Sequence, residues 1–497
     1  MNVMLVNPNC GFQTYMKSAP LGLLSIATYL KQRGCDVRLY DRKIEMLSPE
    51  KATACFWPDA VGVCVGATAD VRDGIKISKW FHERGVTVIW GGQFASIIPE
   101  LVLREGYADY VAIGEGEVTF HELLQAVGGK GEVAGVNGLA YLESGEMHLT
   151  AARQATNLAD FPVIDNSFVD VPKYFFTHVE ISRERVLCIY ASKGCPGSCT
   201  FCYNTGFHRS TCRNRPVDFV LREIEELATN YGMNGIFFVD DDMFGANKND
   251  MLEFCRRLRD LNRDLSLDIT WRCFARAAQY SREELQLLYD AGCRRIFCGV
   301  ESGSQQELER MNKGVNLEDI ENAMRMCHEV GIATASSFVL GFTDETEAQL
   351  METVRVLKRF ESPMNWYQIS KYFPLPGSAM WNQLVAAGRL VPPKTLYEWG
   401  KFKLQEDIFG NFCHVPTRDL HVVQAHFYWK SFFRKTSEKG RVKREVAISA
   451  IRSGLRNILR QNLINMTRYA FSSGLFFLKI TWYAHAYPGV RKKYELY

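Results

Sequence analysis

Residues 186–202 read VLCIYASKGCPGSCTFC, an apolar run that ends in a loop carrying three cysteines. A structural zinc site typically uses two close pairs of ligands, but no second pair follows Cys202, and Cys212 is the only nearby candidate for a fourth ligand. A catalytic redox pair uses two cysteines two residues apart, which would leave Cys195 unexplained. Three thiolates on one short loop, from Cys195, Cys199 and Cys202, can instead hold three corners of a four-iron four-sulfur cluster. The fourth iron would then be open to a small molecule.

The composition is that of a globular protein with more than one domain. The chain has 497 residues, of which 47% are hydrophobic and 23% charged, and its net charge of +3 makes no electrostatic case for nucleic acid. Its N-terminus has no signal-peptide pattern, and its longest apolar stretch, YAFSSGLFFL, is shorter than the roughly 20 residues that span a bilayer. Fifteen cysteines in such a chain indicate a reducing, cytoplasmic setting, where a tight cysteine cluster suggests metal.

Two alternations of strand-like and helix-like segments predict an α/β fold. In the first, the apolar runs VMLV, DVRLYD, AVGVCVGAT, VTVIWGG and YVAIGEGE are separated by segments with helical spacing. We therefore expect a Rossmann-like, doubly wound parallel sheet over residues 1–140, with its ligand beyond the carboxyl ends of the strands. A connector follows over 141–180, with ESGE as a hairpin turn.

The second alternation contains six apolar runs: VLCIYASKG, GIFFVDDD, DITWRCFAR, RIFCGVESG, TASSFVLGF and WYQISKYFPLPG. Six strand–helix units predict a partial (β/α)6 TIM-type barrel over residues 181–395, with its chemistry at the carboxyl ends of the strands. Cys195, Asp241, Arg276 and Glu301, together with Pro374, fall there. The alternation then stops, and residues 396–497 are expected to form a mainly helical region.

The cysteine loop resembles the C-x-x-x-C-x-aromatic-C signature of radical S-adenosylmethionine (SAM) enzymes, at the place where that family carries it. The resemblance implies that the three cysteines bind a 4Fe-4S cluster and that Phe201 lies against the adenine of SAM, which is cleaved to a 5′-deoxyadenosyl radical. FFVDDDMF, WRCFAR and GVESGSQQELERMNKG resemble later strand segments of the family. LGFTDET departs from the common G-x-P-G-E-T, because Thr343 replaces the proline. The further SAM-binding residues implied are Asp241 or Asp242, Arg276, Glu301 and Ser302.

The first 140 residues resemble the cobalamin-binding domain of the cobalamin-dependent radical SAM class. The D-x-H-x-x-G element, whose histidine coordinates cobalt in methionine-synthase-like proteins, is absent, and Phe94 stands where relatives often have histidine in G-G-x-H. A Rossmann-like domain that has lost its cofactor is the alternative. The cobalamin-binding residues implied are Asn7, Pro20, Leu21, Gly22, Thr68, Gly91, Gly92, Gln93, Gly114, Glu115, Gly116 and Glu117.

The region 430–468 is basic and has an apolar strip at helical spacing, while Arg452, Arg456 and Arg460 follow one another four residues apart. Such a helix either packs on the barrel with its arginines in water or lies on an anionic membrane. The second alternative would place the protein at the inner face of the membrane, with a lipid or porphyrin-like substrate.

The two resemblances together imply a cobalamin-dependent C-methyltransferase that acts on an unactivated carbon of a small-molecule or lipid-like substrate, with an electron donor such as flavodoxin or ferredoxin. One alternative is an oxidoreductase or cyclase of the porphyrin or hopanoid type, without methyl transfer. More remote alternatives are a non-catalytic cobalamin or cluster sensor and a zinc protein. The sequence identifies no catalytic acid or base.

Overall fold

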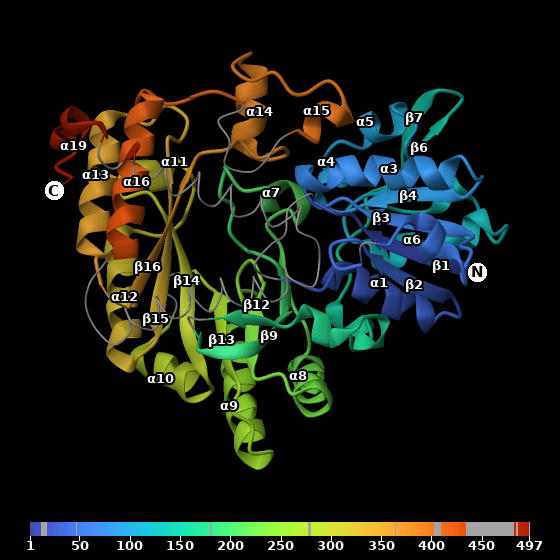
Figure 1. Cartoon of the computed structure of the whole chain (residues 1–497), viewed down its shortest axis with the longest axis horizontal. Coiled ribbons are helices and arrows are strands. Elements are labelled where there is room, and N and C mark those ends of the chain that lie inside the picture. Colours follow the sequence, from blue (N-terminus) through green and yellow to red (C-terminus); the bar gives the residue numbers. More distant parts are fainter. Residues whose placement is uncertain are drawn as a thin grey trace. The chain divides into compact units, whose positions relative to one another are not determined.

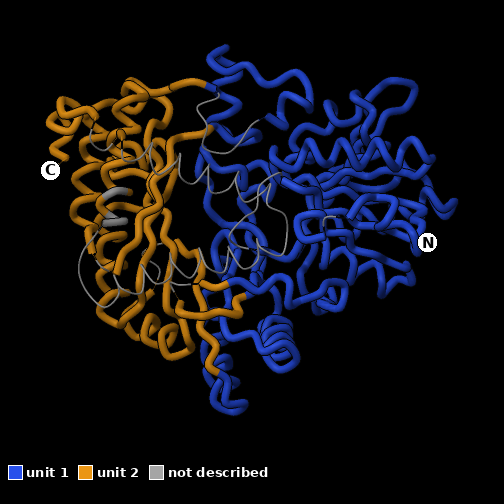
Figure 2. The backbone as a smooth tube through the Cα atoms, viewed as in Figure 1, with its two compact units in different colours: residues 1–176, 187–267, 374–409 blue, residues 177–186, 268–373, 410–497 orange. Residues whose placement is uncertain are grey.

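The chain divides into two compact units (Figure 2). The computed structural model describes residues 1–10, 17–45, 47–178, 181–276, 280–362, 364–401, 409–433, 482–483 and 486–496. Unit 1 comprises residues 1–176, 187–267 and 374–409, and unit 2 comprises 177–186, 268–373 and 410–497. This division differs from the predicted segments 1–140, 141–180, 181–395 and 396–497, which follow sequence motifs and stay a prediction.

The first sheet lies in unit 1, and its described strands have the order β2-β1-β3-β4-β5-β6-β7 (Figure 1). Its parallel strands are β1 (Asn2–Asn7), β2 (Asp36–Asp41), β3 (Ala60–Cys64), β4 (Thr87–Gly91) and β5 (Tyr110–Ala112). An antiparallel hairpin of β6 (Leu139–Glu143) and β7 (Glu146–Leu149) extends it, with the predicted ESGE turn between them. The winding changes direction between β1 and β3, which is where ligands of such sheets bind.

Helices cover both faces of this sheet because its strands are apolar on both sides. On one face, α1 (Leu21–Lys31) and α6 (Gly116–Val127) pack against the strands through a core that includes Leu5, Leu24 and Phe120. On the other face lies α3 (Val71–His82), where Ser78 Oγ accepts a 2.7 Å hydrogen bond from the buried Trp90 indole nitrogen. Shorter helices are α2 (Pro49–Thr53), α4 (Gln93–Ile97) and α5 (Pro99–Arg104). Short 3₁₀ turns occur at Thr68–Asp70, Val133–Gly135, Leu158–Asp160, Asn166–Phe168 and Val171–Tyr174.

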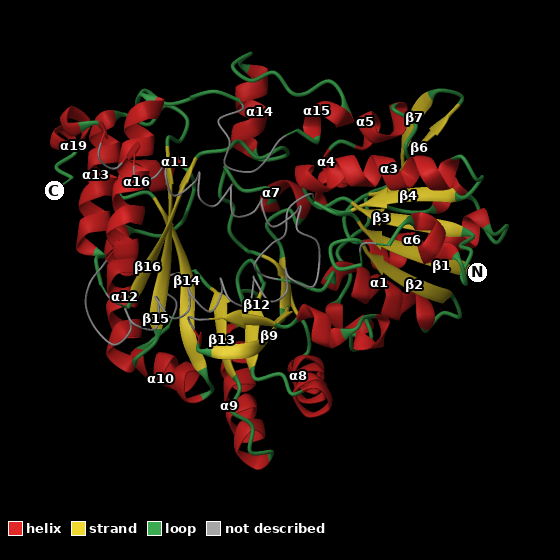
Figure 3. Ribbon diagram, in the orientation of Figure 1, coloured by secondary structure: helices red, strands yellow, loops and turns green. Residues whose placement is uncertain are grey.

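The second sheet is a curled half-barrel whose described strands have the order β16-β15-β14-β13-β12-β9-β8 (Figure 3). The strands are β8 (Phe176–His178), β9 (Arg183–Ile189), β12 (Gly235–Phe238), β13 (Thr270–Phe274), β14 (Cys293–Glu301), β15 (Ala333–Leu340) and β16 (Asn365–Lys371). The pairs from β13 to β16 are parallel. Each of the six predicted apolar runs overlaps one of these strands, β9 or β12 to β16, and the predicted fold class is confirmed.

Capping residues explain where several helices after residue 217 begin and end. Ser281 and Glu284 form a capping box in which each side chain accepts a hydrogen bond from the other's backbone N–H, so α10 starts there. Gly331 ends α12 with φ +91°, a conformation that glycine adopts without strain. The helices are α8 (Val217–Tyr231), α9 (Lys248–Asp264), α10 (Arg282–Asp290), α11 (Gln305–Arg310), α12 (Leu317–Val330), α13 (Glu347–Arg359), α14 (Ala379–Ala386), α15 (Leu396–Trp399), α16 (Thr417–Phe433) and α19 (Pro488–Lys493).

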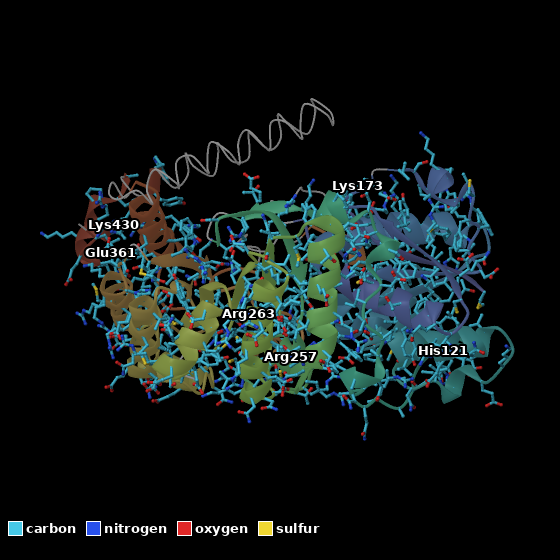
Figure 4. The ribbon with its side chains drawn as sticks, turned by 90° about the horizontal axis from the view of Figure 1, so that it is seen from below. His121, Lys173, Arg257, Arg263, Glu361 and Lys430 are labelled. Atoms are coloured by element: carbon cyan, nitrogen blue, oxygen red, sulfur yellow. The ribbon has the colours of Figure 1, made fainter. Side chains whose placement is uncertain are left out.

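Most of the predicted basic helix at 430–468 lies outside the described residues, because these do not include 434–481. At its start, on α16, Lys430 forms a 3.0 Å ion pair with Glu361, both labelled in Figure 4. Within the described part of the chain, no helix combines the length and the apolar character that crossing a membrane requires. Membrane contact through this region stays a prediction.

Candidate cofactor site

The cysteine loop is held by a short antiparallel hairpin. Strand β10 (Ser192–Gly194) leads into Cys195, and β11 (Cys212–Asn214) closes the hairpin after the loop. Gly194 has φ +85°, and a Cβ atom there would lie 2.1 Å from the carbonyl oxygen of Thr211. No residue with a side chain fits this position, so glycine before the first cysteine is a requirement of the hairpin.

The three cysteines are half-buried and are shaped by contacts within the loop. The Gly197 N–H points at the Cys195 sulfur at 3.4 Å, and the Cys202 N–H donates to the Cys199 carbonyl at 3.1 Å. Helix α7 (Asn204–Phe207) follows directly. The loop is also supported from outside, because the Met380 N–H donates to the Thr200 carbonyl at 2.9 Å.

The three cysteine thiols of the loop are a suitable ligand set for an iron–sulfur cluster. Within the residues that the structure describes, no three His, Cys, Asp or Glu side chains converge as a single ion would require. A four-iron cluster binds each cysteine to a separate iron, so its ligands need not converge. Burial raises the pKa of the Cys202 thiol to about 12, and Asp241 and the other two thiols add to the effect. A bound cluster would supply the positive charge that deprotonation of these thiols requires.

Three consecutive aspartates follow β12 and have different environments. Asp240 is buried and accepts hydrogen bonds from the Ala191 N–H at 2.9 Å and from Ser192 Oγ at 2.6 Å, and burial raises its pKa to about 6. Asp242 is fully buried. Asp241 lines a cavity and accepts a 3.0 Å hydrogen bond from Tyr203 Oη. Of the two aspartates predicted to bind the SAM ammonium, Asp241 is therefore the one with access to a ligand.

A cavity of about 390 Å³ lies in unit 1 and has two kinds of wall. One wall comes from the carboxyl ends of the first sheet and its helices, and the other from the cysteine hairpin and α7. The predicted residues that line it are Leu21, Gly22, Gly91, Gly92, Gln93, Gly114, Glu115, Gly116, Glu117 and Asp241. Nine of the twelve predicted cobalamin residues and one residue of the predicted SAM group therefore line the same cavity, although their role as ligands stays a prediction.

Gly92 shapes the first wall of the cavity. It has φ +96° and ψ 173°, a region that is open essentially only to glycine, and a Cβ atom would lie 2.8 Å from the Val65 carbonyl oxygen. Helix α4 starts directly after it at Gln93. The close approach of β4 to the end of β3 therefore depends on this glycine.

Three predicted cobalamin residues do not line the cavity. Asn7, at the end of β1, donates a 2.9 Å hydrogen bond to the buried carboxylate of Asp41, which also accepts one from Tyr174. Pro20 precedes α1, and Thr68 opens a 3₁₀ turn. Their predicted contacts with cobalamin have no counterpart in the lining of this cavity.

Two ion pairs join the walls of the cavity. Lys193 Nζ lies 2.6 Å from the carboxylate of Glu117, which also accepts a 2.6 Å hydrogen bond from Ser25. Burial alone would raise the pKa of Glu117, but Lys193 and the hydrogen bonds outweigh it and hold the pKa below its usual value. Arg213 forms the second pair, a two-pronged contact with Glu115.

Phe201, between Cys199 and Cys202, is half-buried and belongs to unit 1, whereas the remaining predicted SAM residues, Arg276, Glu301 and Ser302, lie in unit 2. Glu301, with φ +67°, accepts hydrogen bonds from Lys313 Nζ at 2.8 Å and from Ser337 Oγ at 3.2 Å. Arg276 donates to the Lys313 carbonyl at 2.6 Å. Ser302 is fully buried, 3.3 Å from Thr353 Oγ1, so protein surrounds its hydroxyl. Glu301 and Arg276 thus belong to one polar group, while Ser302 has the environment of a structural residue.

The sequence reasoning missed several residues of the cavity wall: Tyr190, Ser192, Lys193, Tyr203, Phe207 and His208. Burial lowers the pKa of His208, which favours a neutral imidazole there. The signal that was available is proximity in sequence, because all six lie within seven residues of a predicted cluster cysteine.

Two family comparisons agree with these two walls. Residues 189–357 match the family described as the Radical SAM superfamily, and residues 13–124 match the B12 binding domain. The first match contains the cysteine loop, and the second contains most of the sheet-side wall of the cavity. The fold and the cysteine loop thus define a radical SAM enzyme.

Individual relatives point the same way. An uncharacterized methyltransferase of Pyrococcus horikoshii is 29% identical over 75% of this chain and 80% of its own length. The anaerobic magnesium-protoporphyrin IX monomethyl ester cyclase of Rubrivivax gelatinosus is 28% identical over 77% and 70%. The structure of the cobalamin-dependent SAM radical enzyme OxsB with aqua-cobalamin matches with a TM-score of 0.71 and 19% identity, over 99% of this chain and 80% of that one, and shows the shared fold.

The chain belongs to the cobalamin-dependent radical SAM enzymes. The expectation of an enzyme whose cofactors are a 4Fe-4S cluster, SAM and cobalamin is confirmed.

Proposed function

We propose that the protein is a cobalamin-dependent methyltransferase that acts on a carbon atom of a small-molecule substrate. The observation that carries the proposal is the cavity of unit 1, because residues of the B12-binding match and of the radical SAM match line the same space. The methyltransferase named among the relatives supports methyl transfer.

The residues present have the chemistry that the cofactors need. Cys195, Cys199 and Cys202 would hold the cluster, and Asp241 would accept the SAM ammonium in a charge-assisted hydrogen bond. Glycine-rich turns at 91–92 and 114–116 would let the corrin approach the main chain closely. When bound, the cluster supplies one electron to SAM, and cobalamin supplies a methyl group that originates from a second SAM.

The protein's own part is to align these groups and exclude water. Apolar side chains such as Leu5, Ile89 and Phe120 line the sheet side of the cavity, so it is suited to keep a reactive species from solvent. Glu301 and Arg276 are the residues that the family resemblance assigns to the ribose and the carboxylate of SAM. Glu301 is charge-compensated by Lys313 in the structure, so the ribose hydroxyls would share a carboxylate that is already oriented.

The test is anaerobic reconstitution of the full chain with iron, sulfide and cobalamin, followed by reduction in the presence of a candidate substrate and of SAM labelled in its methyl group. A methyltransferase forms 5′-deoxyadenosine and methionine from one SAM, and S-adenosylhomocysteine together with labelled product from another. Absence of 5′-deoxyadenosine from reconstituted, reduced protein would contradict the proposal.

A cyclase or oxidoreductase without methyl transfer is the second candidate, and the cyclase among the relatives favours it. That reaction forms 5′-deoxyadenosine but neither S-adenosylhomocysteine nor labelled product. Substrates to examine first are small aromatic and porphyrin-type molecules and lipids, with flavodoxin or ferredoxin as electron donor. A sensor would hold the cofactors and cleave no SAM.

A further inference from the structure

The cysteine hairpin contains an unfavourable pairing of charges. Lys193 on β10 is directly opposite Arg213 on β11. Like charges in this position of an antiparallel pair destabilise it. The hairpin has only three residue pairs, Ser192 with Asn214, Lys193 with Arg213 and Gly194 with Cys212, so it has little backbone pairing to offset the repulsion.

Each of the two cations is compensated by a carboxylate from the start of α6. Lys193 pairs with Glu117 and Arg213 with Glu115, two residues apart at the start of α6. Only 3% of the Glu117 side chain and 17% of the Lys193 side chain are exposed, against 15% and 18% for Glu115 and Arg213. Two ion pairs, one from each strand of the hairpin, therefore join the hairpin to the start of α6.

This double contact restricts the hairpin in more than one direction. A single ion pair would let the hairpin pivot, whereas the second pair, with the two-pronged Arg213 contact, opposes rotation. Arg213 also donates a hydrogen bond to the Thr156 carbonyl, and the Lys193 ammonium lies 5.5 Å from the ring of Phe161. Buried ion pairs contribute little net stability, and their best-attested use is to fix one arrangement among several.

We infer that Lys193 and Arg213, acting through Glu117 and Glu115, are positioning residues that fix the cluster loop relative to the cobalamin-binding loop. The inference rests on the proposed function, since it assigns a purpose to the shared cavity. Lys193 is two residues before Cys195, and Glu115 and Glu117 line the cavity within the predicted cobalamin set. A fixed separation would keep SAM cleavage coupled to use of the radical it produces.

The test measures the separation itself. The full chain is reconstituted with cluster and cobalamin and reduced so that cobalt(II) and the reduced cluster both carry an unpaired electron. Pulsed electron paramagnetic resonance then reports the distribution of distances between the two spins.

Two double variants are compared with the wild type. E117Q/K193M removes both charges of the buried pair, and E115Q/R213M removes both charges of the second pair. Two independent variants keep the test valid if one of them fails to fold. K193R retains the cation, and K31M breaks the exposed Lys31–Asp165 pair of the same unit as a matched control.

We expect a narrow distribution in the wild type, K193R and K31M, and at least a twofold broader one in each double variant at full cofactor occupancy. The ratio of 5′-deoxyadenosine to methylated product should rise by a similar factor. A distribution as narrow as in the wild type in both double variants would overturn the inference. Loss of either cofactor from folded double variants would also overturn it, since the pairs would then serve retention. Failure of the wild type to bind both cofactors would instead overturn the proposed function.

Discussion

The substitution Gly92→Ala tests how the sheet-side wall of the cavity is built. Alanine at φ +96° and ψ 173° occupies a region that costs about 1–3 kcal/mol for a residue with a side chain. Its Cβ atom would also lie 2.8 Å from the Val65 carbonyl oxygen and 3.2 Å from the Gly66 nitrogen. Relief of these contacts requires movement of backbone, and overpacking of this kind costs about 1–3 kcal/mol more.

The matched control is Gly85→Ala. Gly85 also has a positive φ, +71°, but no neighbouring atom would lie within 4 Å of a methyl group at this position, so its cost should be the conformational one alone, about 1–2 kcal/mol. Urea denaturation of the two variants separates the conformational cost from the steric cost. We expect Gly92→Ala to lose about twice as much unfolding free energy as Gly85→Ala.

Gly92→Ala should also weaken the binding of cobalamin, because the added methyl group displaces backbone that lines the cavity. The segment that must move includes Gly66, which lines the cavity together with Gly92. We expect titration with cobalamin, followed by visible absorbance, to show at least a tenfold weaker affinity for Gly92→Ala, equivalent to about 1.4 kcal/mol, and unchanged affinity for Gly85→Ala. Equal stability of the two variants, or wild-type affinity in Gly92→Ala, would refute the reasoning.

Three further outcomes are expected. Cys199→Ala should lose most of its iron and acid-labile sulfide in anaerobic reconstitution assays, and full iron content would exclude the cluster assignment. Ser78→Ala should lower the unfolding free energy by about 1–3 kcal/mol, because the buried Trp90 N–H loses its hydrogen-bond partner. If urea denaturation gave the same unfolding free energy for Ser78→Ala and the wild type, this hydrogen bond would not stabilise the fold. Burial raises the pKa of Glu345 to about 8, against about 4.3 in an unfolded chain. The protonated carboxyl group therefore makes its full contribution to the free energy of unfolding below about pH 4, and this contribution is lost as the pH rises through 8. Glu345→Gln should therefore flatten the pH dependence of unfolding and be more stable than the wild type above pH 8, and parallel pH curves would count against this.

The alternation of apolar runs and helical segments was sufficient to predict both sheets, because a strand buried on both faces leaves a continuous apolar run in the sequence. The ESGE turn and the six runs of the half-barrel each coincide with the observed elements. The cysteine loop was equally readable, since its ligands are close in sequence. Each of these features is formed by residues that are close in sequence, so a local sequence pattern predicts it.

Features that depend on tertiary packing could not be predicted in the same way. Lys193 and Glu117 are 76 residues apart, and neither belongs to a pattern that specifies the other. Asp241 and Asp242 are neighbours in one acidic run, yet only the folded turn decides which faces the cavity and which is enclosed. Ser302 sits in a recognisable motif, but its burial against Thr353 depends on how α13 packs.

The return of residues 374–409 to unit 1 has a practical consequence for dissecting this enzyme. The match to the radical SAM superfamily ends at residue 357, but the outer support of the cysteine loop, the Met380–Thr200 hydrogen bond, comes from beyond that limit. A chain shortened at residue 357 would lack Met380, so the cysteine loop would lose this hydrogen bond. A graft of the first sheet onto a homologue would likewise need to carry the cysteine hairpin and α14 with it, since these three stretches form one unit.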